Sequence, residues 1–202
     1  MKFPFLASFI IFILVVSRAI RRGRQQQADI EANFWARETK ANSVRRKPLD
    51  NLDYIRIPFD RLPTQLMAED PAVAEAIRLL QDLSTQKIVN LTGYTNTDLK
   101  LEYGTANITV LTEYDQNYTL LVRTLQRWAD ALWDAGHERE AASILEFAIE
   151  THTDVSRTYY RLAKYYASRG ESFRIGELIS IAEELRSANK KAIVRTLKES
   201  YL

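Results

Sequence analysis

The 202-residue sequence contains no cysteine, and this absence excludes several kinds of site at once. A disulfide framework, a thiolate zinc centre, a cysteine nucleophile and a cysteine-linked lipid anchor are all ruled out. Glycine and proline are also scarce, with 6 and 5 residues. Sheet-rich folds need more turn residues than this, so the composition favours an all-α fold.

Neither sign of charge dominates the chain, because its formal net charge is only +2, and we therefore expect no nucleic-acid partner. The only histidines, His137 and His152, lack the spacing of metal ligands or of a catalytic base. Phosphate-binding loops, nucleophile elbows and metalloprotease motifs are absent from the sequence. We expect no catalytic residue, no metal and no cofactor, and hence no enzyme.

One long uncharged run is present, over residues 3–17, and an arginine-rich stretch over residues 18–24 follows it directly. As a helix, the run spans roughly 22 Å, short of the roughly 30 Å of a hydrocarbon core, but Lys2 and Arg18 can reach toward the interfaces. We expect residues 1–20 to form a single transmembrane helix, with a cleaved signal peptide or a buried soluble helix as alternatives. We therefore expect a single-pass protein of the cell membrane. By the positive-inside rule, the arginines after the helix predict that its C-terminal domain lies in the cytoplasm.

Two polar or irregular segments come next. Residues 21–47 are rich in charged residues and glutamine, and are expected to form a polar juxtamembrane segment. Residues 48–69 contain three prolines and are expected to form an extended strap on the surface of the following domain. Its contacts would come from Leu52, Tyr54, Ile55, Ile57, Phe59 and Leu62. A strand that docks on a partner is the alternative for this segment.

Residues 70–119 are predicted to form irregular helices, for which a degenerate repeat is one interpretation. Asp70 followed by Pro71 is typical of a helix start, and the apolar spacing predicts a helix to about Leu83. The residues from 90 to 119 are rich in Asn and Thr. Within them Thr95 and Asp98 predict a capping box, with a short helix that ends at Gly104. A further helix is expected over about residues 106–114.

The C-terminal part of the chain contains an internal repeat with a period of 34 residues, because residues 122–155 align with residues 156–189 without a gap. The identical pairs are Arg123/Arg157, Thr124/Thr158, Arg127/Arg161, Ala129/Ala163, Gly136/Gly170 and Ala148/Ala182. Large apolar residues also coincide, at Leu125/Tyr159, Trp128/Leu162, Leu132/Tyr166 and Leu145/Ile179.

This pattern resembles the tetratricopeptide repeat family, whose unit of 34 residues is an antiparallel helix pair. The resemblance implies small residues where helices approach closely and glycine at the turn inside each unit. The sequence departs from the family at Ile175, which replaces the small residue found at Ala141, and no proline closes either unit. Residues 190–202 would add a capping helix. We therefore expect residues 120–202 to form two tetratricopeptide-like repeats and a cap.

Basic residues recur at i, i+4 spacing, which places each pair on one face of the first helix of its unit. In the tetratricopeptide family these helices line a groove, and some members hold a peptide carboxylate there with Lys or Arg. The resemblance implies a groove lined by Arg123, Gln126, Arg127, Asp130, Arg157, Tyr160, Arg161, Lys164, Lys191 and Arg195. The alternative is that these cations are solvated and pair with acidic residues of neighbouring helices.

The expected function is a membrane-anchored interaction or scaffold module, which binds a protein or an acidic peptide in this groove. The alternative is a structural accessory subunit of a larger membrane complex. In that case the strap and its aromatic residues would make the contacts, and the basic residues would not.

Overall fold

The computed structural model describes residues 4–201, and all of its regular elements are helices. In chain order they are α1 (Pro4–Asn42), α2 (Pro71–Ser84), α3 (Asn96–Tyr103), the 3-10 turn η1 (Thr105–Asn107), α4 (Ile108–Asp134), α5 (Glu138–Glu150), α6 (Ser156–Ser168), α7 (Ser172–Glu184) and α8 (Lys190–Tyr201). Within residues 4–201 the one extended pairing is an isolated bridge between Tyr54 and Val89.

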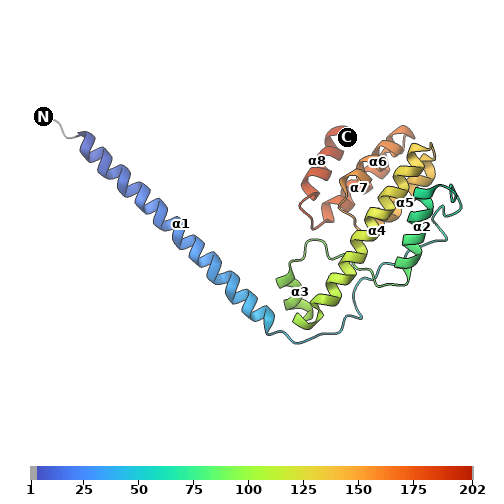
Figure 1. The fold of residues 1–202 in the computed structure, drawn as a ribbon. Helices are drawn as coiled ribbons and strands as arrows, with labels where there is room; N and C mark the ends of the chain where they lie inside the picture. The colour runs from blue at the N-terminus through green and yellow to red at the C-terminus, as the bar shows by residue number, and fades with distance from the viewer. Residues whose placement is uncertain (1–3, 202) are drawn as a thin grey trace. The chain divides into compact units, whose positions relative to one another are not determined.

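The expected transmembrane helix over residues 1–20 is wrong. Across residues 4–201, no helix carries an apolar stretch long enough to cross a bilayer, and residues 1–3 lie outside the described part. The physical reason is that Arg18 interrupts the uncharged run and that Arg21 and Arg22 follow within one turn. The described residues of the apolar run, 4–17, and the polar segment as far as Asn42 are instead parts of one continuous helix, α1, of 39 residues (Figure 1).

The chain divides into two compact units. The first contains α1 and the residues up to Lys47, together with Thr95–Ile108, which form α3 and η1. The second contains Pro48–Tyr94 and the residues from Thr109 onward, and it includes α2 and α4 to α8. Each unit has its own set of stabilising contacts.

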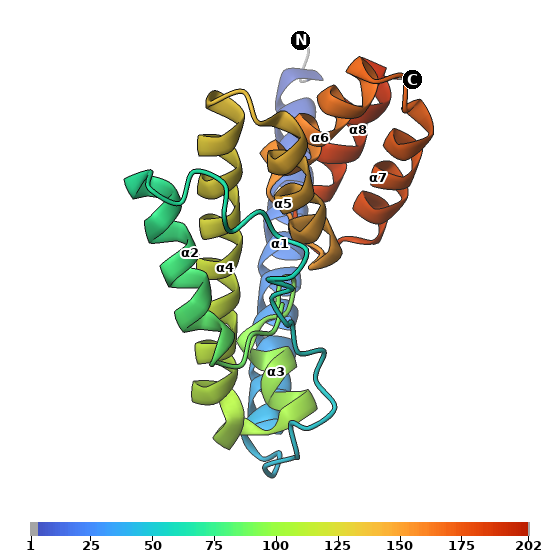
Figure 2. The ribbon, with the colours of Figure 1, turned by 90° about the vertical axis from the view of Figure 1, so that its right-hand side faces the viewer.

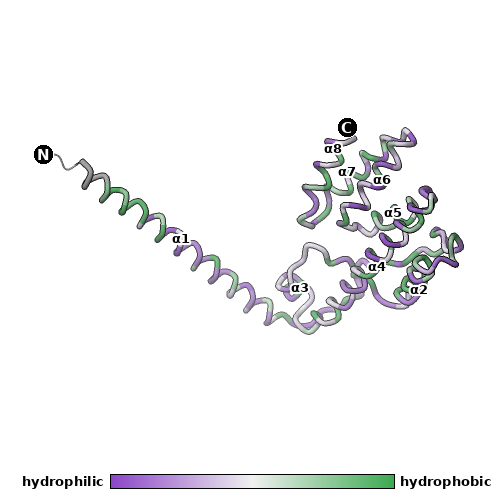
Figure 3. Tube along the Cα trace, turned by 45° about the horizontal axis from the view of Figure 1, so that its top comes forward, coloured by the Kyte–Doolittle hydropathy of each residue, from purple (hydrophilic) through white to green (hydrophobic). Residues whose placement is uncertain are grey.

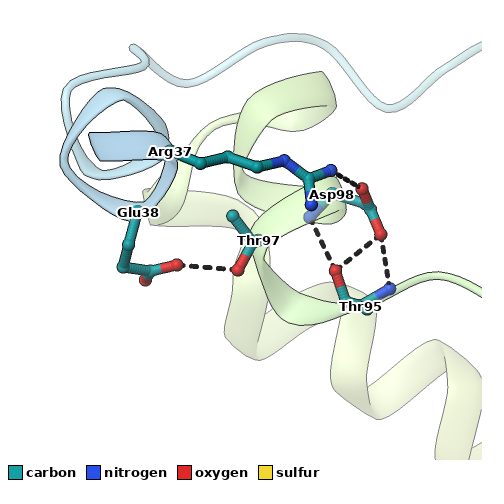
Figure 4. A network of polar contacts seen from close by, with 5 residues as sticks. All are labelled: Arg37, Glu38, Thr95, Thr97 and Asp98. Atoms are coloured by element: carbon teal, nitrogen blue, oxygen red, sulfur yellow. Dashed lines mark hydrogen bonds and ion pairs between the residues drawn. The ribbon is translucent and has the colours of Figure 1, made fainter. Parts of the chain in front are cut away.

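In the first unit, polar contacts fasten the carboxyl end of α1 to α3 (Figure 4). Arg37 pairs with Asp98 and Glu38 pairs with Lys100, while the Thr97 hydroxyl donates a hydrogen bond of 2.7 Å to Glu38. Asp98 also accepts from the backbone N–H of Thr95 at 2.9 Å, which completes the expected capping box. The cap that starts α3 therefore also supplies the carboxylate that holds α1.

The residues after α1 are held by a buried amide and a glycine. Asn107 is fully buried, and its Nδ2 donates to the carbonyls of Lys47 and Tyr103, both at 2.7 Å. Gly104 ends α3 with φ 89, and a Cβ at this position would lie only 2.3 Å from the carbonyl oxygen of Arg45. Only glycine allows this approach of the two backbones.

In the second unit, α5 packs on α6, α6 packs on α7, and α8 packs on both α6 and α7 (Figure 2). Both ends of α7 lie 34 residues after the ends of α5, so the period of the sequence is also the period of the helices. The equivalent small residues Ala129 and Ala163 are fully buried, as are the larger Trp128 and Leu162. These side chains belong to one continuous core that extends from Leu62 to Leu197.

Three helices of this unit end in the same left-handed turn. After α4, Gly136 has φ 86, and the N–H of His137 donates to the carbonyl of Leu132 at 2.9 Å. Gly170 occupies the same position after α6, with φ 71. After α5 the position is taken by His152, with φ 56, whose N–H donates to Ile149 at 2.8 Å. A side chain at such a position is strained, and glycine is the usual residue there.

The strap and the helices before the repeats are built into the same core. Ile57 and Phe59 pack on it, and Asp70 caps α2 by accepting from the N–H groups of Ala72 and Val73, as expected. The helix expected over residues 106–114 is part of the 27-residue α4, which continues without a break into the first repeat. Asn and Thr lower helix propensity here only slightly, and burial of Leu111 and Leu121 outweighs it.

Replacing His152 with glycine is expected to stabilise the second unit, because it relieves the left-handed strain at the end of α5. We expect the free energy of unfolding to rise by up to about 1 kcal/mol, and the melting temperature by about 2–4 °C. Thermal and denaturant unfolding measure this. Gly136→Ala is the control, and it should lower the melting temperature. No atom lies within 4 Å of the added Cβ, so the substitution introduces only backbone strain. A lower melting temperature for His152→Gly would contradict this account.

The docking of α1 on α3 should weaken in acid. The hydrogen bond from Lys100 lowers the pKa of Glu38 below its ordinary 4.5, and the hydrogen bonds from Thr95 lower the pKa of Asp98 below 3.8. Since both pKa values are lower in the folded state, the stabilisation is complete above these ordinary values and is lost as the pH falls through the folded-state values. NMR shifts of the α3 amides would follow this loss. Glu38→Gln should cause much of the same loss of stabilisation at neutral pH, whereas Glu102→Gln, at an exposed position of α3, should not.

Candidate binding surfaces

The expected groove residues lie on α4, α6 and α8, and the centre of this surface is a carboxylate. Asp130 on α4 forms ion pairs with Arg157 at 3.2 Å and with Arg161 at 2.7 Å, both from α6. The Arg161 guanidinium also lies over the ring of Trp133, 5.3 Å from its centroid. Only 18% of the Arg161 side chain is exposed, so this arginine is part of the contact between the two helices.

A hydrogen-bond chain extends this contact. The Gln126 amide donates to Asp130 at 2.8 Å, and its oxygen accepts from the hydroxyl of Thr158 at 2.8 Å. These contacts therefore join α4 to α6 in two ways: by ion pairs at Asp130, and by a hydrogen bond between neutral groups at Thr158. The structure thus brings Gln126, Asp130, Arg157 and Arg161 together, but they are occupied by one another.

Two more of the expected groove residues have partners inside the second unit. Arg127 pairs with Glu75 of α2 at 3.3 Å, and both side chains are exposed. Tyr160 is partly buried against the hydrophobic core. Arg127, Arg157 and Arg161 thus each pair with an acidic residue of a neighbouring helix.

Four cations of the expected groove differ from the others. They are exposed and form no ion pair with any residue in the described part of the chain. We call them the free basic residues: Arg123 on α4, Lys164 on α6, and Lys191 and Arg195 on α8. Their charges are available to a partner in solution, unlike those of the paired arginines.

A cavity of about 480 Å³ lies elsewhere in the second unit, and the sequence did not indicate it. The strap at Asp53 and Arg56, the loop from Asn90 to Tyr94, and the carboxyl ends of α5 and α7 surround it. The Asn90 side-chain amide donates to the carbonyls of Thr151 at 2.9 Å and His152 at 3.1 Å, which holds the loop against α5. Four segments far apart in the chain meet here, so no sequence spacing could reveal the cavity.

The cavity carries charges of both signs. Arg186 lies over the Tyr94 ring at 4.9 Å from its centroid, and Glu150 pairs with Arg61 at 2.6 Å. Next to it, burial raises the pKa of Tyr118 to about 12, so its hydroxyl stays protonated and donates to Thr151 at 3.2 Å. Because charged residues of both signs line it, the cavity favours no one class of ligand.

Comparison with known proteins does not assign this chain to a family. No family model matches the sequence, and no curated protein or solved structure matches it either. The resemblance to tetratricopeptide repeats therefore stays a prediction, based on the 34-residue period of the sequence.

Removing the charge of Asp130 should destabilise the second unit, because it leaves the partly buried Arg161 with only the exposed carboxylate of Asp134, 3.9 Å away. We expect Asp130→Asn to lower the free energy of unfolding by about 1–3 kcal/mol. Glu75→Gln removes the same charge from an exposed pair and should cost less than about 0.5 kcal/mol. Denaturant titration of both variants measures the difference. Equal effects would mean that the Asp130 contacts contribute no more than a surface ion pair.

Proposed function

We propose that this chain is a protein-interaction module that binds an acidic segment of a partner through the free basic residues. One observation carries the proposal: Arg123, Lys164, Lys191 and Arg195 are exposed and unpaired within the described residues, although acidic residues nearby pair with other arginines. Carboxylates of a partner would pair with these four cations through charge-assisted hydrogen bonds.

The internal contacts of the basic surface support this role. Asp130 joins α4 to α6 through Arg157 and Arg161, and α8 packs on α6 and α7. The helices that carry the free basic residues are therefore packed on their neighbours before any partner arrives. A preorganised surface loses less conformational entropy on binding than a flexible one. Rim-exposed charges of this kind mainly increase association rate and specificity, so binding should depend strongly on salt.

The contacts of the strap favour an interaction module over an accessory subunit that would dock on a complex through the strap. Ile55, Ile57 and Phe59 pack on the hydrophobic core of the second unit. Tyr54 stacks edge-on with Tyr114 at 5.9 Å between centroids. These apolar side chains are used within the fold, whereas the free basic residues are not.

Binding of a fluorescent glutamate-rich peptide, followed by anisotropy at low salt, tests the proposal. Replacing Arg123, Lys164, Lys191 and Arg195 with glutamine should weaken binding by at least about tenfold, and raising the salt to about 0.5 M should do the same to the unaltered protein.

The control replaces Arg78 on α2 and Arg139 on α5 with glutamine, and is compared with the double variant Lys191→Gln, Arg195→Gln. Both double variants lose two exposed charges, but only the second alters the proposed site. Equal loss of affinity in the two would show attraction to net charge alone. Unchanged binding in the fourfold variant would overturn the proposal.

A further inference from the structure

The described amino-terminal part of α1 exposes large apolar side chains that nothing in the described chain covers. These are Phe9 and the six residues from Ile11 to Val16, each between 37% and 63% exposed. Figure 3 shows this part of α1 as hydrophobic and the part that follows as largely hydrophilic. We call residues 9–16 the apolar section.

The apolar section has no polar side. Six consecutive residues at 100° per residue cover the whole circumference of a helix. A partner helix would cover a stripe and leave the opposite side in water. Hydrocarbon, which surrounds a helix on every side, is the occupant that fits an apolar surface of this shape.

Charge complementarity identifies the kind of bilayer. Arg18, Arg21, Arg22 and Arg24 follow the apolar section, are exposed, and pair with no acidic residue in the described part of the chain. The first acidic residue of the whole sequence is Asp29. A basic cluster next to an apolar helix section matches the phosphates of an anionic lipid surface.

The arginines decide how deep this section lies. Phe9 precedes Arg18 by nine helical positions, or about 14 Å, so with Arg18 at the phosphates residues 9–16 lie within the roughly 15 Å of hydrocarbon in one leaflet. We propose that residues 9–16 insert into one leaflet of an anionic lipid bilayer, with Arg18–Arg24 at its phosphates. The proposal is independent of the acidic-peptide site and gives the first unit a lipid-binding role.

Vesicle flotation of the full chain tests this inference, using phosphatidylcholine vesicles with and without about one third phosphatidylserine. We expect the protein to float with the anionic vesicles, and replacement of the four arginines with glutamine to weaken partitioning by at least about tenfold. Phe12→Ser combined with Leu14→Ser should abolish flotation. Flotation that is equal in the presence and absence of phosphatidylserine, or unaffected by these variants, would overturn the proposal.

The fourfold variant of the free basic residues is the matched control, because it also removes four positive charges. It should float normally while losing peptide binding, so the two proposals can fail separately. Since the chain has no cysteine, Phe12→Cys provides a single site for an environment-sensitive fluorophore. Its emission should shift to the blue with anionic vesicles only; an unchanged spectrum would exclude insertion.

Discussion

The ion pairs of Asp130 with Arg157 and Arg161 are the contact on which the organisation of the second unit's surface depends. They fix α6 against α4, and α8 in turn packs on α6. One acidic side chain in the middle of a basic series thus binds two of its arginines and joins the two helices. Arg127 of the same series pairs with Glu75 instead, and the free basic residues have no ion pair in the described part of the chain.

Side-chain amides of asparagine hold the irregular parts of both units in place. Asn107 holds the segment after α1 through the carbonyls of Lys47 and Tyr103, and Asn90 holds the loop before α3 through those of Thr151 and His152. Loops expose backbone carbonyls that no helix satisfies, and a side-chain amide can donate to two of them at once. The Asn- and Thr-rich composition, which looks like a mark of irregular structure, therefore supplies the groups that order it.

Local features were predictable because they depend on neighbours in the chain. The Asp70 cap, the Thr95–Asp98 capping box and the left-handed Gly136 all lie where the sequence indicates them. The transmembrane prediction failed because Arg18 and the arginines after it continue the same helix, and within residues 4–201 no helix is long and apolar enough to cross a bilayer. The single α4 was missed because Asn and Thr suggested a break, whereas burial of the apolar face through residues 111–132 keeps the helix continuous.

By itself, the sequence determined the helical class, the helix caps and the 34-residue period, since each follows from interactions within a few turns of one helix or from a repeat of the chain with itself. The tertiary structure alone decided which cations are free. Arg157 and Lys191 occupy equivalent positions, and only the first has a carboxylate within reach, because no counterpart of Asp130 faces Lys191: the equivalent position on α6 is Lys164. The charge that a residue presents to a partner depends on its neighbours across the helix interface, and these are set by packing and not by spacing along the chain.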